Sequence, residues 1–127
     1  MKNRLAETEK LVRSLEGKTL LVEGKHDIAA LEAIGAVASF VTTNGTTQSI
    51  ARKLDGVRKV FLMLDFDREG LRKQGFFKSF LEEQGFSVEM GKARKLRSLL
   101  GFTHVEEIER KYADLKRKGE LHGKNVR

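Results

Sequence analysis

The feature that most constrains the fold is the apolar run Val60-Phe61-Leu62-Met63-Leu64, which stops abruptly at Asp65-Phe66-Asp67. Such a run, bounded by polar residues, is typical of a strand that is buried on both faces of a parallel sheet. Shorter runs at residues 19–22 and 39–42 precede it, and residues 86–90 alternate like an edge strand. We therefore expect four strands, with the run before Asp65 at the centre of the sheet.

Helical patterns separate these runs. Apolar residues spaced by three and four positions predict helices over residues 4–16, 27–34, 48–54, 69–83, 93–100 and 103–118. Thr103 and Glu106 have the spacing of a capping box at the start of the last helix, and residues 119–127 show no periodicity. Strands that alternate with helices predict an α/β fold of the Rossmann-like type, with about four mostly parallel strands covered by helices on both faces.

The length of 127 residues suits one domain with its own core, and no Pro or Ser/Gly-rich linker divides it. We divide this domain into an N-terminal helix (residues 1–17), a core (18–91) and a basic helical extension (92–127). Cysteine is absent, which excludes a disulfide framework, a thiolate zinc site and a cysteine nucleophile. No run approaches the roughly 18–20 apolar residues of a membrane span, so we expect a cytoplasmic protein without a membrane partner.

The positive charge is concentrated at one end of the chain. The net charge is +7, and residues 92–127 hold 11 Lys and Arg against 5 Asp and Glu, whereas residues 1–91 hold 14 against 13. Basic side chains neutralise phosphates and release their counterions, so the asymmetry favours a nucleic-acid partner. A solvated basic surface that keeps the protein soluble is the alternative explanation.

Polar residues follow three of the expected strands. Glu23 follows the first, Asn44 the second and Asp65 the third, and ligands of parallel sheets bind outside these carboxyl ends. Asp65 and Asp67 point to the same face if the strand conformation continues, and two carboxylates so close favour a cation between them. With Glu23 and Glu69, the set of oxygen ligands predicts Mg²⁺, with Mn²⁺ as the alternative ion.

These acids also have a purely structural interpretation. Asp67 can cap the following helix, and Glu69 can interact with the positive end of that helix. Glu23 would then be an exposed acid in a loop.

Two motifs resemble a known family. Val22-Glu23-Gly24-Lys25-His26-Asp27 and Leu64-Asp65-Phe66-Asp67-Arg68-Glu69-Gly70 are similar to the two signature motifs of the Toprim domain. Topoisomerases, bacterial-type primases, overcoming-lysogenisation-defect nucleases and small ribosomal RNA maturases share that domain. The resemblance covers roughly residues 18–91. The second motif is closest to type IA topoisomerases, whereas the first motif and the turn Thr43-Asn44-Gly45 are more similar to 5S ribosomal RNA maturases.

The resemblance implies roles for individual residues. Glu23 would act as general acid or base, or as a metal ligand through water, while Asp65 and Asp67 bind Mg²⁺ and Glu69 supports the ion. Further residues would contact the phosphate: Lys25, Asn44 and Arg68. Ion pairs with the neighbouring acids are the alternative for Lys25 and Arg68. His26 is interpreted as incidental.

The resemblance and the composition together predict a small Mg²⁺-dependent nuclease, with RNA expected ahead of DNA as its substrate. The basic residues expected to hold the nucleic-acid backbone are Lys92, Arg94, Lys95 and Arg97. The single tyrosine, Tyr112, lies outside the resembling segment and is interpreted as a packing residue, which argues against topoisomerase chemistry by this chain alone. The alternative is a non-catalytic module that binds nucleic acid or docks on a larger nucleic-acid-processing protein. A nucleotide-binding enzyme has less support, because the Gly-rich dinucleotide and Walker-type loops are absent.

Overall fold

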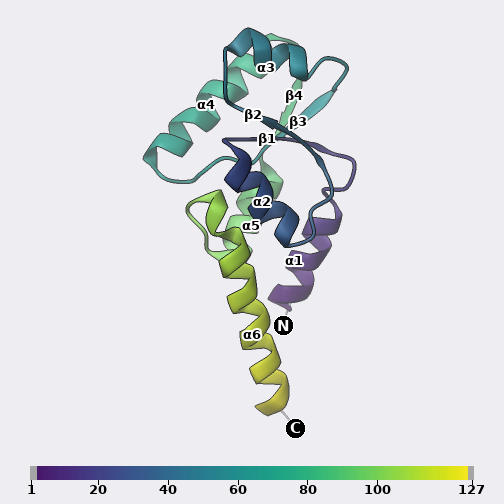
Figure 1. Cartoon of the computed structure of the whole chain (residues 1–127), viewed down its shortest axis with the longest axis vertical. Coiled ribbons are helices and arrows are strands. Elements are labelled where there is room, and N and C mark those ends of the chain that lie inside the picture. The colour runs from purple at the N-terminus through teal and green to yellow at the C-terminus, as the bar shows by residue number, and fades with distance from the viewer. Residues whose placement is uncertain (1–2, 126–127) are drawn as a thin grey trace.

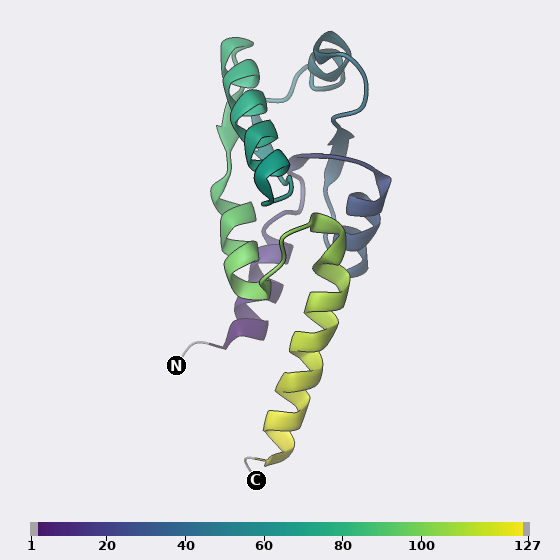
Figure 2. The same ribbon diagram turned by 90° about the vertical axis from the view of Figure 1, so that its left-hand side faces the viewer.

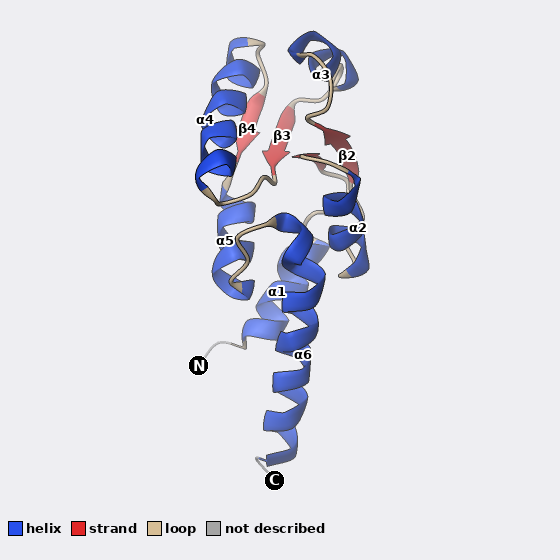
Figure 3. Cartoon of the chain, turned by 60° about the vertical axis from the view of Figure 1, so that its left-hand side comes forward, coloured by secondary structure: helices blue, strands red, loops and turns tan. Residues whose placement is uncertain are grey.

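The structure is a computed structural model and describes residues 3–125 (Figure 1). Its centre is a sheet of four strands: β1 (Thr19–Val22), β2 (Ser39–Thr42), β3 (Lys59–Leu62) and β4 (Ser87–Glu89). The strands lie in the order β2-β1-β3-β4, and each neighbouring pair is parallel (Figure 3, strands in red). The predicted α/β fold class and its four parallel strands are confirmed.

Helices occupy the connections between the strands and the two ends of the described chain. Their bounds are α1 (Arg4–Arg13), α2 (Lys25–Ala33), α3 (Thr47–Lys53), α4 (Arg68–Glu83), α5 (Gly91–Leu100), the 3₁₀ turn η1 (Val105–Glu107) and α6 (Ile108–Asn125). Side-chain caps fix the starts of α1 and α3, because Asn3 accepts the amide of Ala6 at α1 and Thr46 accepts the amide of Ser49 at α3. Over residues 3–125, no helix combines the length and the apolar character needed to cross a membrane.

Alternation along the strands divides the interior into two cores. Leu20 and Val22 of β1 belong to one core, whereas Leu21 between them belongs to the other. The first core also contains buried residues of α1, α2, α5, η1 and the start of α6, and the second contains those of α3 and α4. Helices therefore cover both faces of the sheet, as expected for parallel strands.

The segments on either side of residues 18–91 contribute to the same first core. Leu11 of α1, Leu96 of α5 and Ile108 of α6 are all buried in it. The basic extension is thus packed against the sheet at its beginning. Beyond that point, α6 extends away from the sheet (Figures 1 and 2).

The last helix differs from its prediction at both ends. The expected start at Thr103 is wrong by five residues, because η1 comes first and α6 begins at Ile108. The capping acid is Glu107 rather than Glu106, since Glu107 Oε1 accepts the amides of Thr103 and His104 at 3.0 Å each. The helix also continues through Asn125, past residue 118, into the segment predicted to be aperiodic.

Candidate metal centre

The acidic residues predicted after β1 and β3 lie at the same edge of the sheet. Glu23 directly follows β1, and Asp65 follows β3 by three positions. Because β1 pairs in parallel with both β2 and β3, the ends of these strands lie side by side. The turn that carries Asn44 follows β2 at this edge, and Asn44 is exposed.

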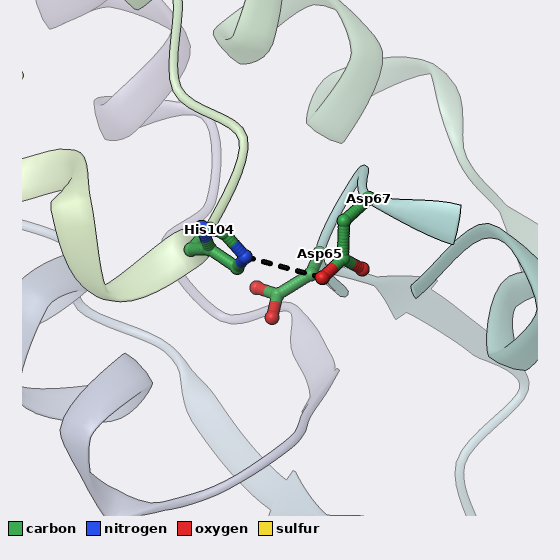
Figure 4. Close-up of side chains that lie close together, drawn as sticks. All are labelled: Asp65, Asp67 and His104. Carbon is green, nitrogen blue, oxygen red and sulfur yellow. Dashed lines mark hydrogen bonds and ion pairs between the residues drawn. The ribbon is translucent and has the colours of Figure 1, made fainter. Parts of the chain in front are cut away.

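Asp67 has two different partners, one for each carboxylate oxygen. Its Oδ1 accepts the amide of Gly70 at 2.7 Å and so caps α4, which confirms the capping interpretation. Its Oδ2 lies 3.1 Å from Nε2 of His104 (Figure 4). The Gly70 amide, together with His104, holds the pKa of Asp67 below its usual value. Capping therefore uses only one of the two oxygens.

Asp65 is fixed through both its side chain and its backbone. Its Oδ1 accepts the amide of Val105 at 2.8 Å, and its carbonyl oxygen accepts a hydrogen bond from the buried amide of Gln74 at 2.9 Å. Burial raises the pKa of Asp65 to about 6, and the negative charges of Glu23 and Asp27 add to this rise. A cation beside Asp65 would offset both effects, because it stabilises the ionised carboxylate.

Gly70 allows the loop between Asp65 and α4 to close tightly. A Cβ atom at position 70 would lie 2.2 Å from the carbonyl oxygen of Asp65 and 2.7 Å from its Cβ. No side chain fits that space, so the glycine that ends the second motif is required by the packing of the loop.

His104 was not singled out by the sequence. It lies 37 positions after Asp67, in the loop between α5 and η1, and no local pattern marks it. The bond with Asp67 raises the pKa of His104, and the charges of Asp65 and Glu107 act in the same direction. Its Nδ1 lies 3.9 Å from Oε1 of Glu107, so the ring has a carboxylate on each side.

The segment around His104 runs along the acidic loop. The amide of Phe66 donates to the carbonyl of Thr103 at 2.7 Å, and the amide of Val105 donates to Asp65. The rings of Phe66 and Phe102 pack edge to face with their centroids 5.7 Å apart. The residues that follow α5 are therefore a wall of the site, although the sequence suggested only a basic surface there.

Glu23 lies beside Asp65 but is held by a residue that the sequence did not indicate. Lys73 Nζ donates to Glu23 Oε1 at 2.7 Å, across 50 positions of sequence, and this bond raises the pKa of Lys73. Asp27, which is buried, accepts the amide of Glu23 at 3.3 Å. Burial raises the pKa of Asp27.

Glu69 lies outside the group formed by Asp65, Asp67 and His104. It is exposed on the first turn of α4 and pairs with Arg72, which lowers the pKa of Glu69. Arg68 and Lys25 are exposed at the first positions of α4 and α2. The structure brings Asp65 and Asp67 together beside Glu23, and does not bring Glu69 to them.

The four basic residues predicted on α5 point in different directions. Lys92 Nζ donates to Ser14 Oγ at 2.9 Å, and Lys95 lies 3.8 Å from Glu7, so both are directed into a groove between α1 and α5. Arg97 instead lies over the ring of Phe66, 5.1 Å from its centroid. Arg94 is also exposed on this helix. Of the four, Arg97 therefore contacts the loop that carries the two aspartates.

Three side chains have the composition of a metal site. Asp65, Asp67 and His104 each offer one ligand atom, and in the described part of the chain these atoms all lie within 4.8 Å of one another. Two carboxylates and an imidazole form a donor set that suits a divalent cation. Burial, and to a smaller extent the charges of Glu23 and Asp27, raises the pKa of Asp65, and a bound cation would counteract both effects.

The fold and this centre define an α/β protein of Rossmann-like type with an acidic site at the carboxyl edge of its sheet. No family model matches the chain. A solved structure of a protein from Aquifex aeolicus is similar to it, with a TM-score of 0.65 and 30% identity over 83% of this chain and 94% of the other.

Two curated proteins are also similar. A UPF0292 protein of Methanosarcina barkeri is 27% identical over 122 residues, which covers 87% of this chain and 82% of the relative. A UPF0292 protein of Methanocaldococcus jannaschii is 36% identical over 67 residues, and the chain spans about half of that relative, 51% of its length. The names of these proteins state no activity.

Proposed function

We propose that this protein is a Toprim-like hydrolase that cleaves nucleic-acid phosphodiesters with a divalent metal ion bound at Asp65 and Asp67. The observation that carries the proposal is the meeting of these carboxylates with Glu23 at one edge of a parallel sheet. It is the arrangement expected from the two motifs that resemble the Toprim domain. The carboxylates favour Mg²⁺, with Mn²⁺ as the alternative.

The residues of the site have distinct roles in this proposal. A bound divalent ion would polarise the phosphate and lower the pKa of a water molecule. Glu23 would accept the proton of that water, and the hydrogen bond from Lys73 would hold the Glu23 carboxylate in position. Arg97 would bind the phosphate backbone beside the site, because its guanidinium lies on Phe66, between the two aspartates in sequence.

RNA is the substrate proposed ahead of DNA, since the first motif and the Asn44 turn are the parts most similar to ribosomal RNA maturases. Lys25, Asn44 and Arg68 are exposed and begin the helices or turns at this edge. We propose that they contact phosphates of the substrate. Processing of RNA would take place in the cytoplasm, and recovery of the protein from the membrane or secreted fraction of cells would contradict that location.

The test is cleavage of end-labelled structured RNA, and of duplex DNA of the same sequence, with Mg²⁺, with Mn²⁺ and without metal. Wild type is expected to cut and Asp65→Asn and Asp67→Asn to lose at least about 100-fold in rate. Glu82→Gln, which changes an exposed acid paired with Lys78 on α4, is the matched control and should retain full activity. Equal cutting by wild type and both aspartate variants would reject the hydrolase.

One observation favours a second candidate, a non-catalytic module that binds nucleic acid or a larger nucleic-acid-processing protein. Glu23 is bonded to Lys73 and lies outside the three-residue group of ligand atoms. Salt-sensitive binding of RNA without metal, combined with no cleavage under any metal condition, would favour this module.

A further inference from the structure

The imidazole of His104 meets the acidic pair at a separation that suits a shared ion. Its Nε2 lies 3.1 Å from Asp67 Oδ2, and the ligand atoms of Asp65, Asp67 and His104 lie within 4.8 Å of one another. Bonds of about 2.1 Å to one ion place neighbouring ligand atoms of an octahedron about 3.0 Å apart. The observed contact matches that edge, so a small shift suffices for both atoms to face one cation (Figure 4).

The position of His104 is set by the segment that carries it. Thr103 and Val105, its two neighbours, bond to Phe66 and to the carboxylate of Asp65. Glu107 accepts the amides of Thr103 and His104, and the same carboxylate oxygen lies 3.9 Å from the ring Nδ1. At this distance Glu107 places its negative charge beside the ring nitrogen that is turned away from Asp67, without a hydrogen bond to it.

We propose that His104 Nε2 is a metal ligand together with Asp65 and Asp67, and that this site selects a first-row transition-metal dication over Mg²⁺. The proposal rests on the proposed function, because it assumes that the two aspartates bind a metal. Imidazole is a good ligand for transition metals, whereas Mg²⁺ prefers oxygen ligands and water. Mn²⁺, the alternative to Mg²⁺ at this site, binds carboxylates and also accepts an imidazole, so it is the transition-metal ion with which the preference over Mg²⁺ is measured.

The competing explanation is that His104 only forms an ion pair with Asp67. In that case the imidazole competes with any cation for Asp67, and removing it should strengthen or leave unchanged the binding of every divalent ion. A ligand role predicts the opposite for Mn²⁺. The two explanations therefore differ in the sign of the effect.

The experiment is calorimetric titration of metal-free protein with Mn²⁺ and with Mg²⁺. Wild type is expected to bind Mn²⁺ at least about tenfold more tightly than Mg²⁺. His104→Ala and His104→Gln should lower Mn²⁺ affinity at least about tenfold and change Mg²⁺ affinity much less. Gln retains an amide that can donate to Asp67, so agreement of both variants separates ligation from the hydrogen bond.

A spectroscopic readout complements the affinities. Mn²⁺ bound to wild type should show ¹⁴N modulation in pulsed electron paramagnetic resonance, and this signal should disappear in His104→Ala. His26→Ala, which changes an exposed histidine on α2, is the matched control and should retain it. Metal binding without ¹⁴N modulation, or a Mn²⁺-to-Mg²⁺ preference unchanged in His104→Ala, would overturn the inference. If wild type itself bound neither Mn²⁺ nor Mg²⁺, the proposed function on which this inference rests would be rejected.

Discussion

His104 Nε2 lies 3.1 Å from Asp67 Oδ2, although 37 positions separate the two residues. The other oxygen of the same carboxylate caps α4 through the amide of Gly70. Capping and metal binding are therefore compatible roles for Asp67, since each uses its own oxygen. An aspartate that caps a helix with one oxygen holds the other in a fixed direction, which is useful for a ligand.

Asp65→Asn should stabilise the metal-free protein at neutral pH. Because burial raises the pKa of Asp65 from 3.8 to about 6, the folded state holds a proton that the unfolded state releases. The free energy of unfolding should therefore fall as the pH rises from about 4 through 6. Above that range Asp65 is ionised in both states, and the free energy falls no further on its account. The rise in the pKa of Asp65 corresponds to a loss of at most about 3 kcal/mol in the free energy of unfolding. Because the side chain is partly exposed, we expect Asp65→Asn to recover only about 1 kcal/mol.

Urea unfolding at pH 4 and pH 7.5, with chelator present, measures this effect. The free energy of unfolding of Asp65→Asn should exceed that of wild type at pH 7.5, and the two values should agree closely at pH 4. Asp67→Asn is the comparison, and it should not raise the free energy of unfolding, because the Gly70 amide lowers the pKa of Asp67. A pH-independent difference between Asp65→Asn and wild type would show that ionisation is not the cause.

Gly70→Ala should disrupt the acidic loop, because the added methyl group would lie 2.2 Å from the carbonyl oxygen of Asp65. Overpacking of this kind costs about 1–3 kcal/mol, and the displaced loop should also lose metal affinity. Gly75→Ala on the same helix is the matched control, since nothing lies within 4 Å of its added carbon. The free energy of unfolding of Gly75→Ala should rise by about 0.5–1 kcal/mol, because alanine has a higher helix propensity than glycine. Denaturant unfolding and Mn²⁺ titration check both, and a Gly70→Ala protein as stable as Gly75→Ala would contradict the packing argument.

Arg97→Ala should weaken nucleic-acid binding much more than Lys95→Ala. Arg97 lies on Phe66 beside the aspartates, whereas Lys95 is directed toward Glu7 of α1. Loss of one phosphate contact should reduce the slope of log affinity against log salt by about 1. Arg97→Lys keeps the charge but loses the planar group that stacks on the ring, so an intermediate affinity is expected. Fluorescence anisotropy with labelled RNA measures all three, and equal losses for Arg97→Ala and Lys95→Ala would mean that binding depends on overall charge.

Addition of Mn²⁺ should raise the melting temperature of wild type, and chelation should reverse the rise. An ion that binds only the folded state contributes about 2.7 kcal/mol at 100 times its dissociation constant. The double change Asp65→Asn/Asp67→Asn should abolish the rise without lowering the melting temperature of the metal-free protein by a comparable amount. A rise that persists in the double variant would place the ion elsewhere on the chain.

The sheet was predictable because its signals are local. The run before Asp65 is apolar on both faces, and its successive members Val60 and Phe61 enter different cores. The two aspartates come at the end of that run, so their place beyond the carboxyl end of the strand was determined by position alone. Asp67 at the cap of α4 was one of the two interpretations of the same signal.

The partners of the acids were not predictable, because they lie far away in the sequence. Lys73 is 50 positions from Glu23, and Val105 is 40 positions from Asp65. Lys92 and Lys95 formed a basic cluster with Arg97 in the sequence, yet they contact α1 instead of the acidic loop. Such pairings depend on how the helices pack on the sheet, and periodicity along one helix does not specify them.

The bond from Val105 to Asp65 has a consequence for the order in which the protein is made. The nascent chain leaves the ribosome from its N-terminus, so Asp65 emerges 40 residues before the amide that it accepts. Until that segment has emerged, Asp65 lacks the amide of Val105 and the neighbouring imidazole of His104, and Phe66 lacks the Phe102 ring that packs against it. The acidic edge is therefore completed only when the loop after α5 has been synthesised. A chain truncated between Glu89 and Val105 would contain all four strands and the acids but would lack the segment that forms the wall beside them.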